Sequence, residues 1–216
     1  MIKDFINTIY PDFCAGCNNI LSISEKGICS SCWIELKKFD NSNNTFFFGR
    51  RKVEMEFYAF EFVKNQLFQK IIHKIKYKGN KAAARVLGIE LGKVVQSKSI
   101  EIDVIIPVPI SNKKRSYRGF NQCDYISDGV QQIIKKPVVS DFLLRADILN
   151  SQINSNRYRR WEKVENQFII KGDSLGLVHV LLVDDIVTSG ATIHGCVKTL
   201  TNENLKVSVA ALAKAQ

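Results

Sequence analysis

The sequence has no apolar run that approaches the ~20 residues needed to span a membrane. Its N-terminus, Met1-Ile2-Lys3-Asp4-Phe5-Ile6, has an early acid and lacks the pattern of a signal peptide. The chain also has no internal repeat and no low-complexity tail. The lack of a long apolar run and of a signal peptide argues against an integral membrane protein and predicts a cytoplasmic one. Such a protein can still contact a membrane peripherally.

Acidic residues are scarce relative to basic ones, 21 against 31, which gives a formal net charge of +10. This excess fits a phosphate-rich ligand, a nucleic acid or an anionic membrane surface, and charge alone does not choose among them. A solvated basic surface without a special partner is the alternative. The length of 216 residues, 45% of them hydrophobic, suits one ordinary domain plus a small extra module.

Four cysteines near the N-terminus form two CxxC pairs, Cys14 with Cys17 and Cys29 with Cys32. Each pair can supply two thiolates from one tight turn, and two pairs complete a tetrahedral Zn²⁺ site without an open position. Disulfides or free thiols are the alternative, and the expected cytoplasmic location disfavours disulfides. We therefore predict a zinc-ribbon module over residues 1–45 whose structural metal supplies its folding free energy.

The boundary at about residue 45 follows from a polar run over residues 41–44, which is typical of a linker. After the second cysteine pair, Trp33, Ile34 and Leu36 predict a short helix that packs back on the cysteine module. The three phenylalanines at 46–48 are interpreted as a strand that docks between the two modules, with an exposed patch as the alternative.

The second domain, residues 46–216, alternates between strand and helix patterns. Strands are predicted over 55–62, 103–106, 180–183 and 205–212, and helices over 66–77, 82–95, 121–135 and 191–202. This pattern predicts an α/β fold with a parallel sheet flanked by helices. His73 is placed on a polar helix face without a catalytic role, and Cys123 and Cys196 are interpreted as small apolar helix residues.

Two acids, Asp184 and Asp185, follow the apolar run 180–183, where a central strand should end. The loop and helix start that come next contain Thr188, Ser189, Gly190, Ala191 and Thr192. Ligands bind beyond the carboxyl ends of parallel strands, and a glycine loop that opens into a helix binds anions. Because carboxylates hold sugar hydroxyls or hydrated Mg²⁺, the stretch predicts a phosphate with a polyol beside it. The alternative is a strand end and a hydroxyl helix cap without a ligand.

A basic stretch follows the strand at 103–106 and the turn Pro107-Val108-Pro109. Arg115 and Arg118 lie in it, and we expect a basic, glycine-containing loop that faces the same crevice. Guanidinium groups there can clamp a pyrophosphate through paired hydrogen bonds. A solvated basic loop is the alternative.

The stretch Val180–Thr192 closely resembles the phosphoribosyl pyrophosphate (PRPP) motif of type I phosphoribosyltransferases. The resemblance implies that the loop Thr188–Thr192 holds the ribose 5-phosphate and that the catalytic pair Asp184 and Asp185 contacts the ribose hydroxyls. It also implies Mg²⁺ on the pyrophosphate and a transfer of the phosphoribosyl group, with no acceptor site legible.

Other segments resemble the ComF family, whose members are phosphoribosyltransferase-like proteins with an N-terminal zinc module, linked to DNA uptake in natural transformation. The matching residues are Tyr77-Lys78-Gly79, Pro107-Val108-Pro109, Arg118-Gly119-Phe120-Asn121-Gln122, Leu144, Arg145, Gln152, Arg160, Val164 and Phe168. One departure is Lys163, which stands where the family usually has Asn. The resemblance implies a PRPP-binding protein that acts in DNA uptake alongside other competence proteins.

A non-catalytic module that handles single-stranded DNA is the competing hypothesis, with the PRPP pocket regulatory or vestigial. Tyr158 and Trp161 lie among Arg145, Arg157, Arg159 and Arg160. Aromatic side chains between arginines can stack the bases of a single strand. They can equally cover the edge of the core while the arginines face water.

Overall fold

A computed structural model describes residues 11–41, 47–48, 51–63, 66–145, 167–171 and 176–215. Its centre is a four-stranded sheet in the order β3-β8-β7-β4, in which every neighbouring pair is parallel. The strands are β3 (Glu56–Phe62), β4 (Val104–Pro107), β7 (His179–Val187) and β8 (Lys206–Ala215). The predicted parallel sheet is confirmed.

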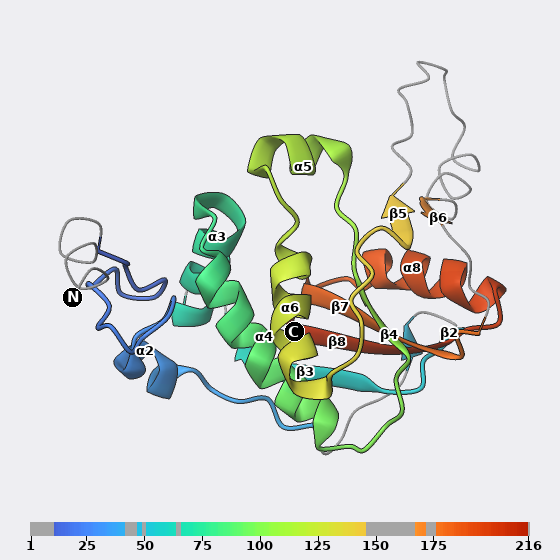
Figure 1. Ribbon diagram of the computed structural model, residues 1–216, viewed down its shortest axis with the longest axis horizontal. Coiled ribbons are helices and arrows are strands. Elements are labelled where there is room, and N and C mark those ends of the chain that lie inside the picture. Colours follow the sequence, from blue (N-terminus) through green and yellow to red (C-terminus); the bar gives the residue numbers. More distant parts are fainter. Residues whose placement is uncertain are drawn as a thin grey trace.

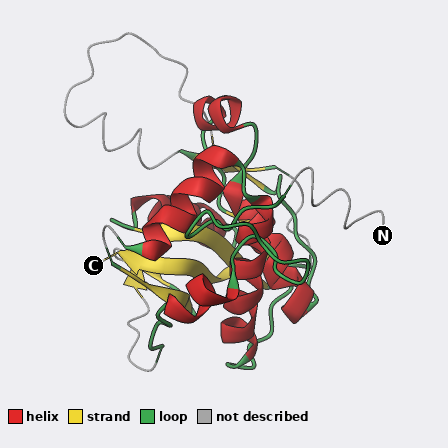
Figure 2. Cartoon of the chain, turned by 90° about the vertical axis from the view of Figure 1, so that its left-hand side faces the viewer, coloured by secondary structure: helices red, strands yellow, loops and turns green. Residues whose placement is uncertain are grey.

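Helices cover both faces of this sheet (Figures 1 and 2). On one face α4 and α6 pack against the strands with α3 beside them, and α8 packs on the other face. Their bounds are α3 (Leu67–Lys78), α4 (Lys81–Gln96), α6 (Gln122–Ile134) and α8 (Ala191–Asn202). These helices lie within a residue or two of their predicted positions, and His73 is exposed on α3 as expected.

The central strands are apolar on both faces because each face is covered. Leu181 and Val183 of β7 belong to the core under α3, α4 and α6, whereas Val180 and Leu182 belong to the core under α8. All four side chains are fully buried, and each such burial stabilises the fold by roughly 1.5–3 kcal/mol. This explains why the sequence Val180–Val183 is a continuous apolar run instead of an alternation of apolar and polar residues.

Two glycines let α4 and α6 approach to backbone contact. A Cβ at Gly88 would lie 2.1 Å from the carbonyl oxygen of Ile126, and one at Gly129 would lie 2.2 Å from that of Arg85. Any side chain at these positions would push the helices apart. The close packing fixes the first turn of α6 at the carboxyl end of the sheet.

The segment that follows the cysteine module joins the sheet directly. Phe39 N–H donates to the carbonyl oxygen of Ala59 at 3.1 Å, and Glu61 N–H donates to that of Lys37 at 3.0 Å, so residues 37–39 extend the edge beside β3. The predicted short helix exists as α2 (Ser30–Glu35), and its side chains share a buried core with both the cysteine module and β3. Trp33 contacts Phe60 of β3 edge to face, with ring centroids 6.0 Å apart.

The two other residues predicted to pack from this helix differ in exposure. Leu36 is buried as predicted, whereas Ile34 is 83% exposed. Because the linker segment 42–46 lies outside the described residues, the boundary at 45 stays a prediction.

The phenylalanine strand does not dock between the modules. Residues Phe47–Phe48 form β1, which pairs with β2 (Arg51–Lys52). This short hairpin lies against α8, on the side of the sheet away from the cysteine module (Figure 1). Phe46 lies outside the described residues.

Candidate functional site

The acid pair, Asp184 and Asp185, lies within β7 rather than after it. The strand runs on to Val187, and Asp184 pairs with Ala211 of β8. The sequence-based strand end at Val183 is therefore wrong by four residues. The long neighbouring strand β8 keeps supplying backbone partners beyond that point. Since side chains alternate along a strand, the two carboxylates point to opposite faces of the sheet.

Asp185 points toward α3 and α6 and is buried, with 4% of its surface exposed. Its Oδ2 accepts a hydrogen bond from Gln122 Nε2 at 2.8 Å and forms an ion pair with Lys76 Nζ at 2.8 Å. Its Oδ1 accepts from the N–H of Ile186 at 2.6 Å. Burial lowers the pKa of Lys76, but attraction to Asp185 outweighs it and raises that pKa. Both carboxylate oxygens of Asp185 are thus engaged within the protein.

Asp184 points to the α8 side and is partly buried. Its Oδ1 accepts from the N–H of Asp185 at 2.8 Å and from the thiol of Cys123 at 3.4 Å. Burial, followed by repulsion from Asp185, raises the pKa of Asp184 to about 7. The acid pair therefore holds one carboxylate that is locked by a lysine and one that titrates near neutral pH.

Cys123 is not only the small apolar residue that the sequence suggested. Burial, followed by the negative charge of Asp184, raises the pKa of its thiol well above the ordinary value, so it stays protonated and can donate. Cys196 of α8 is also fully buried, and burial followed by the charge of Asp184 raises its pKa as well.

Lys76 and Gln122 are site residues that the sequence analysis did not identify. A signal for Lys76 did exist. It follows the buried Ile72 by four residues, so it shares the apolar stripe of α3. Gln122 begins α6 and was seen only as part of a family motif.

The loop after β7 leaves the start of α8 open to a ligand. Gly190 takes the left-handed conformation with φ of 72° at the N-cap position, and within the described part of the chain no side chain caps the helix. Ser189 Oγ lies 3.5 Å from the N–H of Ala191, a long contact. Thr188 and Ser189 are exposed. Gly190, rather than a hydroxyl residue, therefore stands at the N-cap, and the first-turn amides suit an anion.

The basic stretch after β4 is a helix rather than the expected loop. This helix, α5 (Asn112–Arg118), is capped by the Ser111 side chain and ends at Gly119 in the left-handed conformation. Arg118 Nη1 donates to Gln122 Oε1 at 2.9 Å, so Arg118 reaches the network around Asp185. Arg115 is exposed. The structure thus joins Arg118 to Asp185 through Gln122, and it shows no such link for Arg115.

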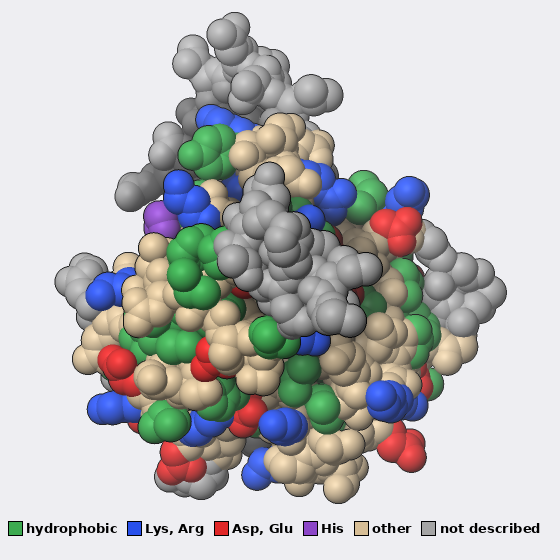
Figure 3. All heavy atoms as spheres, turned by 60° about the vertical axis from the view of Figure 1, so that its left-hand side comes forward, with side chains coloured by type: hydrophobic (Ala, Val, Ile, Leu, Met, Phe, Trp, Pro, Cys, Tyr) green, Lys and Arg blue, Asp and Glu red, His purple; other side chains and the backbone are tan. Residues whose placement is uncertain are grey.

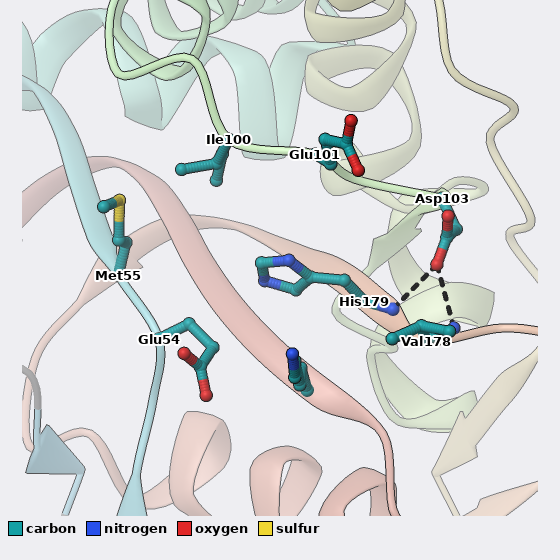
Figure 4. A pocket seen from close by; sticks show the side chains of 8 residues that line it. Glu54, Met55, Ile100, Glu101, Asp103, Val178 and His179 are labelled. Atoms are coloured by element: carbon teal, nitrogen blue, oxygen red, sulfur yellow. Dashed lines mark hydrogen bonds between the residues drawn. The ribbon is translucent and has the colours of Figure 1, made fainter.

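A cavity of about 430 Å³ opens at the opposite end of the sheet, where the strands begin (Figure 4). Its lining comprises Glu54, Met55, Ile100, Glu101, Asp103, Val178, His179 and Lys206. Asp103 Oδ2 accepts from the N–H groups of Val178 and His179 at 2.8 Å each. His179 Nε2 lies 2.9 Å from Ser208 Oγ. These groups pin the starts of the strands to one another, so this cavity is not the candidate site.

The four cysteines of the N-terminal module come together as predicted and can hold a zinc ion. The Sγ atoms of Cys14, Cys17, Cys29 and Cys32 all lie within 4.8 Å of one another. Cys17 Sγ and Cys29 Sγ are 3.7 Å apart, close to the ~3.8 Å edge of a tetrahedron with Zn–S bonds of ~2.3 Å. Burial raises the pKa of Cys14, but backbone N–H groups of Cys29, Cys17 and Gly16 outweigh it and lower that pKa to about 6.

The proposed base-stacking segment falls almost entirely outside the described residues, as do Gln152, Arg157–Trp161, Lys163 and Val164. Arg145, in β5 (Leu143–Arg145), is described. It donates to Gln167 Oε1 at 3.1 Å and lies over the ring of Phe168 in β6 (Phe168–Ile170). Arg145 therefore packs on its neighbouring strand.

Comparison with curated proteins finds full-length similarity. "Competence protein F" of Haemophilus influenzae is 23% identical over 94% of this chain and 96% of its own length. The similarity to this competence protein thus extends over nearly the whole chain. Competence protein ComFC of Bacillus subtilis is 22% identical over 67% of this chain and 58% of its own length. The DNA utilization protein YhgH of Salmonella typhimurium is 27% identical over 57% and 56%.

A scan of protein-family models finds no match. Among solved structures, glutamine PRPP amidotransferase from B. subtilis has a TM-score of 0.43 and 20% identity, over 60% of this chain and 26% of the other. An adenine phosphoribosyltransferase has a TM-score of 0.38 and 13% identity, over 68% and 76%. Among the described residues, no helix is long and apolar enough to cross a membrane.

Proposed function

We propose that this protein binds PRPP at the carboxyl edge of β7. The observation that carries the proposal is the acid pair beside the uncapped start of α8. The 5-phosphate would accept hydrogen bonds from the loop Thr188–Thr192, and the ribose hydroxyls would donate to the ionised carboxylate of Asp184. Asp185, held by Lys76 and Gln122, would keep the end of the strand in place.

The pyrophosphate would extend toward Arg118, which reaches this network through Gln122. Arg115 lies one turn earlier on α5 and would add positive charge at longer range. Bound Mg²⁺ supplies charge neutralisation of the pyrophosphate. Both carboxylate oxygens of Asp185 are engaged within the protein, so Asp185 would not hold this ion directly.

Transfer of the phosphoribosyl group is the reaction class that this arrangement suits. The bond between the anomeric carbon and the pyrophosphate oxygen breaks, a nucleophile bonds to that carbon, and pyrophosphate leaves with the electron pair. Positive charge develops on the ribose, where the acid pair would stabilise it. The protein's own contribution is to position the ribose and the leaving group.

Calorimetry with PRPP and Mg²⁺ tests this proposal. We expect wild type to bind and Asp184→Asn to lose roughly ten- to a hundredfold in affinity, since one charge-assisted contact is worth ~1.5–3 kcal/mol. Asp141→Asn is the matched control, because Asp141 is an exposed acid that pairs with Lys171 at the surface and takes no part in the network of the acid pair. The absence of PRPP binding to wild type would rule the proposal out.

The same titrations should depend on pH. The pKa of Asp184 is raised from 3.8 to about 7 in the folded protein, so folding favours its protonated form and its carboxylate forms only as pH rises through 7. Affinity for PRPP should therefore increase from pH 6 to pH 8. In Asp184→Asn only the titration of the ligand's phosphates should remain. Parallel pH profiles for the two proteins would contradict a role for the Asp184 carboxylate.

A role in DNA uptake is the second candidate, and the names of the competence and DNA utilization relatives favour it. Deletion of the gene should lower the transformation frequency, and the wild-type gene should restore it. Complementation with Asp184→Asn then separates two versions of the proposal. Failure to restore transformation means that the PRPP site acts in uptake, whereas full restoration means that a non-catalytic DNA-handling module suffices. Normal transformation by the deletion strain would contradict both.

A further inference from the structure

A pocket of about 610 Å³ lies between the end of α3, the start of α4 and the end of α5, next to the acid pair but distinct from it. Its lining comprises Lys76, Tyr77, Lys78, Gly79, Lys81, Tyr117, Arg118 and Phe120. Four of these residues are cations, three are aromatic, and no acid is among the described residues that line it. We call this the aromatic–cationic pocket.

The aromatic rings of the pocket are unusually open to solvent. Tyr117 is 79% exposed and Tyr77 is 47% exposed, and their ring centroids are 6.4 Å apart. Tyr77 is also covered by His73 at 4.7 Å and by the guanidinium of Arg118 at 5.1 Å. Tyr117 therefore offers the open ring face. So large an exposed ring adds little to the core, which favours a role in binding.

The cations of the pocket are divided between internal contacts and solvent. Lys76 pairs with Asp185, and Arg118 donates to Gln122. Arg118 also keeps a buried Nε without a hydrogen-bond partner among the described residues. Lys81 lies 5.0 Å above the Tyr125 ring, and Lys78 is exposed. Lys78 and Lys81 thus hold positive charge at the mouth of the pocket, where it can meet an anion.

The wider surface has the same character. Because Figure 3 is turned about the vertical axis from Figure 1, α5 lies near the top of the described residues in both views. Lys and Arg side chains gather in that region of Figure 3 beside hydrophobic ones. Lys113, Lys114 and Arg115 on α5 are exposed. Together with the net charge of +10, this end attracts anionic ligands over a distance of about one Debye length, ~8–10 Å.

We propose that the aromatic–cationic pocket binds one nucleotide unit, with its base stacked on Tyr117 and its phosphate held by Lys78 and Lys81. A bare phosphate or pyrophosphate would need the cations but not the exposed rings. An apolar ligand would need the rings but not the cations. A planar base joined to a phosphate uses both, and stacking on tyrosine tolerates any base. The unit can come from a free nucleotide or from a single strand.

This proposal goes beyond PRPP binding and uses different residues. The loop Thr188–Thr192 and Asp184 hold the sugar phosphate of PRPP, whereas Tyr117, Lys78 and Lys81 hold the nucleotide unit. The two sites meet only at Lys76 and Arg118. A change at Tyr117 should therefore alter nucleotide binding and leave PRPP binding in place.

Calorimetry on the full chain with three probes tests the pocket: 5′-AMP, ribose 5-phosphate, which lacks the base, and a dT oligomer of about ten nucleotides. Loss of one stacked base should lower affinity roughly 5- to 100-fold in Tyr117→Ala, whereas Tyr117→Phe, which keeps the ring, should bind like wild type. Affinity for ribose 5-phosphate should be the same in all three proteins. Lys78→Ala should weaken binding of AMP and the oligomer, and Lys98→Ala is its exposed, charge-matched control.

The titrations with AMP and with the oligomer identify the source of the nucleotide unit. A Tyr117-dependent loss with AMP indicates free nucleotides, and a loss with the oligomer alone indicates a single strand. If Tyr117→Ala binds both within about twofold of wild type, the pocket is not a nucleotide site. An equal loss for ribose 5-phosphate would likewise overturn base stacking. PRPP titrated into Tyr117→Ala reports on the other site, so failure of one proposal is distinguishable from failure of the other.

Discussion

Loss of one zinc ligand, as in Cys17→Ser, is expected to abolish metal binding and to unfold residues 11–36. Cys17 is the one exposed member of the cluster, so the substitution removes a ligand without opening a cavity in the core. A structural zinc site contributes about 10–16 kcal/mol to the folding of isolated zinc-finger peptides. The buried Cys14, Leu21, Ile28 and Cys32 belong to a core that the module shares with the larger domain.

The measurement combines metal content with thermal unfolding. Wild type should carry bound zinc, and both a chelator and Cys17→Ser should lower the unfolding midpoint. Ser31→Ala, an exposed non-ligand position inside the second CxxC pair, should keep zinc and midpoint unchanged. The zinc prediction would be contradicted if the purified wild-type protein carried no metal and its unfolding midpoint did not change on addition of the chelator.

The unfolding caused by Cys17→Ser should extend beyond the cysteine module, because the module shares its core with the larger domain. Trp33 rests on Phe60, and residues 37–39 add to the edge of the sheet. Lys74 of α3 also donates to the carbonyl oxygen of Cys14 at 3.2 Å. We expect the freed segment to expose Phe60 and the first turns of α3.

Local patterns in the sequence were sufficient for most of the fold. The helices and strands follow from hydrophobic period and length, and the cysteine cluster follows from two CxxC pairs. The loop before α8 was also placed correctly, since Gly190 marks the helix start and takes a left-handed conformation there. Each of these features depends on residues that are close in the chain.

Two features were misjudged although local signals existed. Ser111 and Gly119 are the cap residues of α5, and they outweigh the basic composition that suggested a loop. β7 continues through the acid pair because β8 offers matching backbone groups up to Lys214. A strand end read from polarity alone misses this, because backbone pairing does not require apolar side chains.

The contacts of the acid pair depend on tertiary structure. Gln122 and Cys123 reach Asp185 and Asp184 from more than 60 residues away along the chain. Their closeness rests on the glycine contact between α4 and α6, which holds the first turn of α6 over the end of β7. No periodicity records such an approach, so the different environments of Asp184 and Asp185 could be recognised only in the structure.

Lys76→Met should be strongly destabilising because it leaves the buried Asp185 carboxylate without its cation. Lys76 Nζ lies 2.8 Å from Asp185 Oδ2, and the two side chains are 22% and 6% exposed. Removal of one partner of a buried ion pair costs about 3–5 kcal/mol, and the hydrogen bond from Gln122 places the expected loss at the lower end. Urea unfolding measures it, with Lys70→Met on the exposed face of α3 as the control.

A double substitution decides whether the effect comes from the charge of Asp185. Asp185→Asn removes that charge, so Lys76→Met/Asp185→Asn should be less destabilised than the sum of the single changes by about 1–3 kcal/mol. Additive losses, or a Lys76→Met protein as stable as Lys70→Met, would contradict the ion pair. A coupled pair would mean that Asp185 is neutralised within the protein before any ligand arrives. Asp184 would then be the acid left to meet the ribose.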